Sequence, residues 1–328
     1  MNIFDKLKKG NPWFSIFAIE AYMESMDLEL TPENQVNALY KFQKKYEFDL
    51  VFPRMDLDEY VEIVSNAEDK KSQISKSKDW SQFGPKDIFK ITSDENIIQS
   101  STYKVLQNLQ TDSNDIFRYV GGYIPAPYTL VSLILDLQTA SELVIFEPDY
   151  LKSLVKFTIP IIKQYTKLIS EFVDTFFILA PSECTIMKNS YINIIQESMN
   201  DLIAYCALEL KKPTLIHFCA SKVSQVVNEE VVKPMKEAGL LGLNVPNIIE
   251  SKDLAKKYDL ILCGGIDPVK IQVEPEQKTL EELRVLLENT SDINYIFATN
   301  CQVKWAPGQI SSEQLNALFT KIKDLLDQ

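Results

Sequence analysis

The chain has 328 residues, of which 45% are hydrophobic, and a formal net charge of −12. This length and apolar content are sufficient for one large domain with a substantial core. The acidic balance argues against nucleic acid and anionic membranes as partners, because both are themselves negatively charged. Only three of the 34 basic residues are arginines, Arg54, Arg118 and Arg284. Because arginine is the residue that usually binds carboxylates, this scarcity argues against a substrate with many carboxylates.

Cysteine usage and hydropathy indicate the compartment. The N-terminal residues show no signal-peptide pattern, and no run approaches the roughly 20 apolar residues of a membrane-spanning helix. The cysteines are odd in number and widely spaced: Cys184, Cys206, Cys219, Cys263 and Cys301. This pattern is typical of reduced thiols, so we expect a cytoplasmic protein with no membrane partner.

The first 45 residues are expected to form a helical segment. Residues up to about Met26 carry an apolar stripe that we expect to pack on the main body, formed by Trp13, Phe14, Phe17, Ala18, Ala21 and Tyr22. A second helix is predicted to begin at Pro32, with Thr31 as its N-cap.

Beyond this segment, apolar strands alternate with helical patterns. The polar stretch 65–90 is expected to be a long loop or excursion; an ordinary solvent loop is favoured, and a segment that flanks the mouth of the barrel is the alternative. Helices are predicted at about 148–172, 190–209, 222–238, 251–257, 279–289 and 312–327. Strands are predicted at 48–53, 118–124, 175–180, 214–219, 241–245, 260–264 and 295–299, with a weaker eighth candidate at 88–91.

This alternation is typical of βαβ units with a parallel sheet. Eight such strands close a barrel, so we predict one (β/α)8 TIM barrel over residues 1–328, with an N-terminal helical extension in residues 1–45. An open, doubly wound sheet is the alternative, but no Gly-x-Gly-x-x-Gly turn follows the first strand. In a barrel, the active site lies at the carboxyl ends of the strands.

One strand carries a pair of potential metal ligands. His217, the only histidine, and Cys219 stand two residues apart and should face the same side, with Phe218 on the other. A second apolar strand leads to Cys301, which supplies a third ligand. One imidazole and two thiolates fit zinc, and three ligands leave one tetrahedral position open, as in catalytic sites. A core histidine with two inert cysteines is the alternative interpretation.

Together these segments resemble the uroporphyrinogen decarboxylase superfamily, and within it the methylcobamide:coenzyme M methyltransferase branch. Residues 122–130 (GYIPAPYTL) and 264–268 (GGIDP) are similar to two turns of the superfamily. The combination of His217, Cys219 and Cys301 is similar to the zinc-binding pattern of the methyltransferase branch. The chain departs from the usual pattern at Ala180 and Asn244, where Asp is common, and at Gly265, where Asn is usual.

The resemblance implies a zinc-dependent enzyme that moves a methyl group from a methylcobamide, carried on a separate corrinoid protein, to a small thiol such as coenzyme M. Homocysteine-like thiols and a reduced folate remain open as acceptors. Two other functions also remain open. One is a metal-independent decarboxylase like uroporphyrinogen decarboxylase, and the other is a non-catalytic protein that binds a corrinoid or a thiol.

Three further residues near predicted strand ends are candidates for the site. Glu183 could fill the fourth zinc position, or could be an acid on a solvent-exposed loop. Asp267 is the second candidate acid for that position and a candidate for cofactor binding, or could cap the turn at Pro268. Arg54 could hold the anionic end of the substrate, or could form an ordinary surface ion pair.

Overall fold

The computed structural model describes residues 12–14, 19–25, 27–65, 82–90, 92–111, 119–219, 226–274, 276–301 and 311–327. Six strands form one sheet in the order of the sequence, and every neighbouring pair is parallel. The strands are β1 (Gly121–Pro125), β2 (Thr175–Leu179), β3 (Thr214–His217), β4 (Gly242–Asn244), β5 (Ile261–Ile266) and β6 (Tyr295–Thr299).

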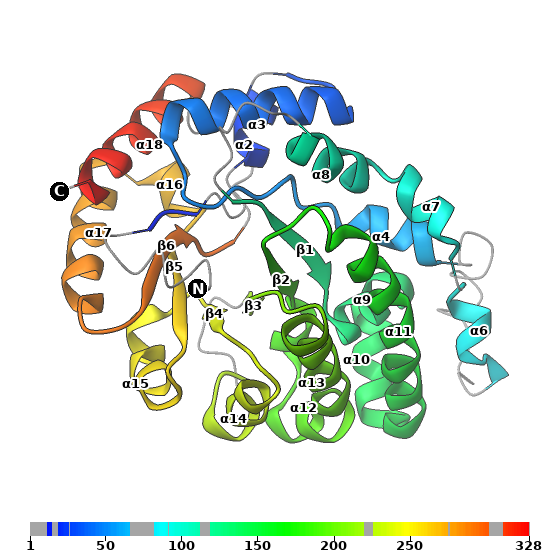
Figure 1. The fold of residues 1–328 in the computed structure, drawn as a ribbon. Coiled ribbons are helices and arrows are strands. Elements are labelled where there is room, and N and C mark those ends of the chain that lie inside the picture. Colours follow the sequence, from blue (N-terminus) through cyan, green and yellow to red (C-terminus); the bar gives the residue numbers. More distant parts are fainter. Residues whose placement is uncertain are drawn as a thin grey trace.

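Two very short segments close this sheet into a barrel. Residues 13–14 lie beside β6, and residues 50–51 lie between residue 14 and the start of β1. The backbone N–H of Phe14 donates to the carbonyl of Phe297 at 3.0 Å, so the contact has the hydrogen bond of a regular strand pair. The parallel bridges are Trp13 with Phe297, Phe14 with Leu50, and Val51 with Val120. The predicted eight-stranded barrel is therefore confirmed, and its strands ring the centre in Figure 1.

The position of the eighth strand differs from the prediction. Trp13 and Phe14 do not belong to a helix: Trp13 packs in the core outside the barrel and Phe14 in the core inside it. This alternation is the two-residue period of a strand, which the longer helical stripe concealed. The weak candidate at 88–91 is wrong, because residues up to Ile88 form a helix and Phe89 makes an antiparallel bridge to Ser65 away from the barrel.

Two of the helices expected in the N-terminal segment are observed, α2 (Ile19–Ser25) and α3 (Pro32–Tyr46), and they connect the barrel segments at residues 13–14 and 50–51. Thr31 caps α3, since its hydroxyl accepts the N–H of Asn34 at 3.2 Å. Several predicted positions lie outside the described residues: Phe17, Ala18, Ile91, Arg118, residues 66–81 of the polar stretch and the start of the helix predicted at 222–238.

Helices form the outer layer around the strands (Figure 1). Those before β2 are α4 (Leu57–Val64), α6 (Pro85–Ile88), α7 (Asp94–Gln99), α8 (Ser101–Thr111), α9 (Pro127–Leu135), α10 (Leu137–Phe146) and α11 (Pro148–Ile169). Those after β2 are η2 (Ser182–Thr185), α12 (Lys188–Ile194), α13 (Gln196–Ala204), the π-helical η3 (Tyr205–Glu209), α14 (Glu229–Glu237), α15 (Ile248–Tyr258), α16 (Lys270–Val273), α17 (Glu276–Thr290) and α18 (Ser312–Leu326).

Helices α9 and α10 were not predicted from the sequence. Both helices lie between β1 and α11 in the sequence. Asp136 separates them and has a positive φ of 77°. The Asp136 carboxylate caps α10 by accepting the N–H of Thr139 at 2.8 Å. Across the described part of the chain, no single helix has the length and apolar character of a membrane span; α9 and α10 meet the criteria only as a pair, bent by 113°.

Aromatic side chains fill the inside of the barrel. Phe52 stacks on Tyr123 with ring centroids 4.8 Å apart, and Phe177 meets both rings edge-on. Phe177 in turn lies parallel to the imidazole of His217, with centroids 6.4 Å apart and an interplanar angle of 22°. Because His217 is the last residue of β3, this aromatic column ends at the carboxyl end of the barrel.

We predict that Trp13→Ala destabilises the protein by about 3–5 kcal/mol, the usual cost of removing a buried aromatic side chain. Trp13 is 6% exposed and its ring contacts Phe48 at 4.4 Å between centroids, as well as Phe297 and Phe319. The free energy of unfolding in urea measures the effect. Val285→Ala, at a side chain that is 48% exposed, is the control and should change stability by less than about 0.5 kcal/mol. A loss below about 1 kcal/mol for Trp13→Ala would show that this seam is not needed for closure.

Candidate metal centre

Strand β3 supplies two of the candidate ligands. His217 is its last residue and pairs in register with Leu179 of β2 and Asn244 of β4. Cys219 follows two residues later, while the fully buried Phe218 packs in the core outside the barrel. The predicted arrangement is confirmed: the imidazole and the thiol share one face and the phenyl ring takes the other.

The third ligand follows β6, and the end of β5 shapes the chain around it. Asn300, immediately before Cys301, accepts the N–H of Gly265 at 2.7 Å. Gly264 and Gly265 have φ values of +142° and +118°, and a Cβ on Gly265 would lie 2.3 Å from the hydroxyl of Tyr295. A side chain at this position would be strained, so the turn requires glycine there.

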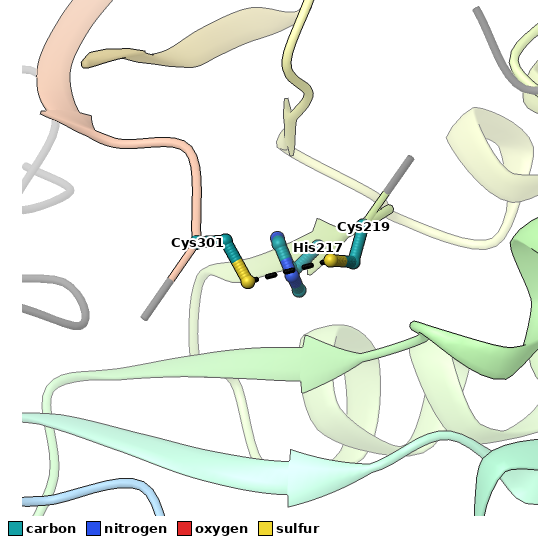
Figure 2. A group of neighbouring side chains, drawn as sticks. All are labelled: His217, Cys219 and Cys301. Carbon is teal, nitrogen blue, oxygen red and sulfur yellow. Dashed lines mark hydrogen bonds between the residues drawn. The ribbon is translucent and has the colours of Figure 1, made fainter. Parts of the chain in front are cut away.

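The three side chains converge as the sequence predicted. One potential ligand atom from each of His217, Cys219 and Cys301 lies within 4.8 Å of the other two, although the cysteines are 82 residues apart. Figure 2 shows the imidazole beside the line that joins the sulfur atoms, which are 3.3 Å apart. His217 is only 3% exposed, whereas both cysteines are half-buried, so the sulfur side of the group faces the opening.

These distances fit a zinc ion. A tetrahedral ion with Zn–S bonds of about 2.3 Å and a Zn–N bond of about 2.0 Å places its sulfurs roughly 3.8 Å apart and each sulfur roughly 3.6 Å from the nitrogen. The sulfurs would have to separate by about half an ångström, which a side-chain rotation supplies. Soft sulfur ligands favour zinc over magnesium or calcium. Within the described ranges, no second group of three such side chains meets the same distance limit.

A buried asparagine determines which imidazole nitrogen faces the metal position. Nδ1 of His217 lies 2.6 Å from Oδ1 of Asn244, and Nδ2 of Asn244 donates to the carbonyl of Thr299 at 3.3 Å. A carbonyl only accepts hydrogen bonds, so the amide oxygen must face the imidazole. Nδ1 therefore carries the proton and Nε2 carries the lone pair that a metal needs. From the sequence, Asn244 was identified only as a position where aspartate is more common. Its pairing in register with His217 accounts for the hydrogen bond to the imidazole.

The thiols influence each other strongly. The hydrogen bond to the Cys301 thiol, burial and the nearby thiol of Cys184 all raise the pKa of Cys219 well above its ordinary value. In the metal-free protein, Cys219 is therefore a neutral thiol at physiological pH. A metal must displace its proton to bind the sulfur as a thiolate.

The structure does not bring Glu183 to the three ligands. Its carboxylate is 0% exposed and accepts the N–H groups of Tyr128 and Thr129 at 3.2 and 3.1 Å, together with the Thr129 hydroxyl. Burial raises the pKa of Glu183 to about 7, although these hydrogen bonds act in the opposite sense. Glu183 fixes the start of α9 to the turn after β2, and the alternative prediction of a solvent-exposed acid is wrong.

Asp267 and Arg54 stand at the same end of the barrel, after β5 and after the bridge residue Val51. Oδ1 of Asp267 accepts the N–H of Val269 at 2.8 Å, so this residue caps its turn. The guanidinium of Arg54 forms an ion pair with Asp56, and the Arg54 side chain is 26% exposed. Both alternative interpretations are observed, and a role of either residue in binding a substrate or cofactor stays a prediction.

Comparison with known proteins shows the same fold in enzymes of methyl transfer. The chain superimposes on a methyltransferase from Methanosarcina mazei with a TM-score of 0.70 and 15% identity, over 99% of this chain and 98% of that one. It also superimposes on a Listeria monocytogenes protein assigned as a vitamin-B12-independent methionine synthase, with a TM-score of 0.52, 11% identity and 96% coverage of each chain. The chain shares the fold of these proteins. No protein-family model and no curated protein sequence matches it.

We predict that the zinc affinity rises steeply with pH. The raised pKa of Cys219 means that zinc must displace a proton there, and a second cysteine ligand releases another on becoming a thiolate. Two released protons raise the apparent association constant by about 100-fold per pH unit below the thiol pKa values. Competition with a chromogenic chelator between about pH 6 and pH 8 measures this slope. Cys206→Ala, at a buried cysteine outside the group, should keep the slope, and a slope near zero in the unaltered protein would contradict thiolate ligation.

We predict that ionisation of Glu183 destabilises the fold. Its pKa is about 7 in the folded protein against 4.5 for an unperturbed glutamate, so the folded state binds more protons between these limits and stability falls as pH rises through them. Relative to Glu183→Gln, the unaltered protein should lose on the order of 2 kcal/mol of unfolding free energy between about pH 5 and pH 8. Urea unfolding of both proteins across this range measures the difference. A difference that stays constant with pH would refute the raised pKa.

Proposed function

We propose that the protein is a zinc-dependent methyltransferase that moves a methyl group from a methylated corrinoid, carried by a separate protein, to a small thiol of the coenzyme M kind. The observation that carries this proposal is the convergence of His217, Cys219 and Cys301 at the carboxyl end of the barrel. Three ligands with half-buried sulfurs leave an open position that a fourth ligand from solution can reach.

The chemistry of the site suits a thiol acceptor. Zinc held by these three residues would lower the pKa of an added thiol, so that the acceptor is anionic at neutral pH. Asn244 keeps Nε2 of His217 directed to the metal position, and the buried rings of Phe177 and Phe52 pack inside the barrel beside the imidazole. In the transfer, the thiolate sulfur would attack the methyl carbon to form a carbon–sulfur bond, the carbon–cobalt bond would break with its electron pair left on cobalt(I), and the thiol proton would already have passed to solvent.

A partner protein that carries the corrinoid would dock at the carboxyl end of the barrel strands. Met187, Ile249 and Val269 follow the carboxyl ends of β2, β4 and β5, and their side chains are 62%, 49% and 64% exposed. Exposed apolar side chains at the end of the barrel that holds the metal ligands suit a protein that presents a corrinoid. The fold shared with the Methanosarcina methyltransferase supports the same reaction class. We assign Arg54 and Asp267 to acceptor or cofactor binding as part of this proposal.

The test combines a zinc assay with demethylation of free methylcobalamin. We expect about one zinc ion per chain and loss of the carbon–cobalt absorption only when a thiol is supplied, with coenzyme M ahead of homocysteine and reduced folate. Cys219→Ala should lower both zinc content and rate by at least about 100-fold, because one of three ligands is removed. Cys206→Ala, at a fully buried cysteine outside the ligand group, is the matched control and should retain both.

Other outcomes separate the remaining functions. Decarboxylation of a porphyrinogen that persists in the presence of a chelator would replace this proposal with a metal-independent decarboxylase. Stoichiometric zinc and a bound corrinoid protein, without turnover of any thiol, would indicate a binding protein. A protein that holds no zinc and is unchanged by Cys219→Ala would refute the proposal entirely.

A further inference from the structure

We infer that Asn244 is a positioning residue that fixes the imidazole of His217 for metal binding and ties it to the strand that leads to Cys301. This inference rests on the metal site of the proposed function, although its first test requires no metal. Asn244 is the last residue of β4 and is 0% exposed, so its contacts do not compete with water.

The amide of Asn244 joins three strands at the mouth of the barrel. Its oxygen accepts from His217 on β3 at 2.6 Å, and its nitrogen donates to the carbonyl of Thr299 on β6 at 3.3 Å. Burial raises the pKa of the Cys263 thiol on β5, and the nearby amide of Asn244 acts in the opposite sense. Thr299 is two residues before Cys301, so this contact links the chain segments that supply the two halves of the metal site.

Only a primary amide satisfies both partners at once. The imidazole needs an acceptor at 2.6 Å and the Thr299 carbonyl needs a donor, and an amide offers one of each. An aspartate would keep the acceptor for His217 but would place a second oxygen against the Thr299 carbonyl. Alanine would remove both hydrogen bonds from a fully buried site, which is costly.

The neutral amide also determines the charge of the site. A carboxylate on Nδ1 would make the imidazole a more basic ligand. With the amide, the ligand set of a neutral imidazole and two thiolates carries two negative charges, which balance a divalent zinc ion. Asn244 therefore leaves more of the charge of the ion to act on an added thiol than an aspartate would.

The first test uses the only histidine in the chain. In metal-free protein labelled with ¹⁵N-histidine, NMR at a pH where the ring is neutral should show a single imidazole with its proton on Nδ1. Asn244→Ala should give a mixture of tautomers, and Asn244→Asp, which still accepts from Nδ1, should restore the Nδ1–H form. A proton on Nε2 in the unaltered protein would overturn the inference. This outcome is measured on the unaltered protein alone, so it does not depend on whether the variants fold.

The second test measures metal affinity. Zinc binding by chelator competition should weaken by about 10- to 100-fold in Asn244→Ala, the usual loss when the partner of a metal-ligating histidine is removed. Thr158→Ala, at a buried α11 residue whose hydroxyl bonds only its own helix backbone, is the control for a general loss of packing and should bind zinc normally. A folded Asn244→Ala that binds zinc within about threefold of the unaltered protein would overturn the inference.

The two tests separate the role of Asn244 from the proposed methyl transfer. If the unaltered protein shows the Nδ1–H tautomer and binds zinc but transfers no methyl group, Asn244 keeps its role and the assigned reaction fails. If the tautomer is correct and no metal binds, the metal site itself fails, while the hydrogen bond between Asn244 and His217 stands.

Discussion

The pairing of residues 13–14 with β6 on one side and with residue 50 on the other closes the sheet, and the candidate metal centre depends on that closure. Neighbouring strands are about 4.8 Å apart, so β3 and β6 would be separated by roughly 14 Å in a flat sheet. The ligand atoms that follow these two strands nevertheless lie within 4.8 Å of one another. Curvature into a barrel brings them together, because strands three positions apart then face each other across the mouth.

The centre combines a rigid half with an accessible half. His217 is buried, stacked against Phe177 and hydrogen-bonded to Asn244, so its ring has little freedom. Cys219 and Cys301 are half-buried and follow the ends of β3 and β6. An ion held by these three residues would keep one position open for a fourth ligand, as the proposed function requires.

Much of this arrangement could be predicted from local sequence patterns. The alternation of His217, Phe218 and Cys219 gives the face of each side chain, and the run of strands and helices gives the barrel. The strand at residues 13–14 is too short to show a two-residue period. The apolar stripe at helical spacing therefore led to the prediction of a helix there. The hydrogen-bond partners of Asn244 depend on the register of β4 with β3 and on β6, where Thr299 lies 55 residues further along the sequence. No local pattern encodes these contacts. The burial of Glu183 depends on the packing of α9, which no pattern near Glu183 encodes.

The closing seam has a consequence for how the molecule forms on the ribosome. Trp13 is synthesised among the first residues of this sequence, whereas its partner Phe297 and the ligand Cys301 both emerge close to its end. The nascent chain can thus assemble the interior of β1 to β5 while its first strand still has one free edge. Closure of the barrel and assembly of the three candidate ligands therefore occur together, after β6 has been synthesised. A chain that ends before β6 has neither a closed barrel nor Cys301.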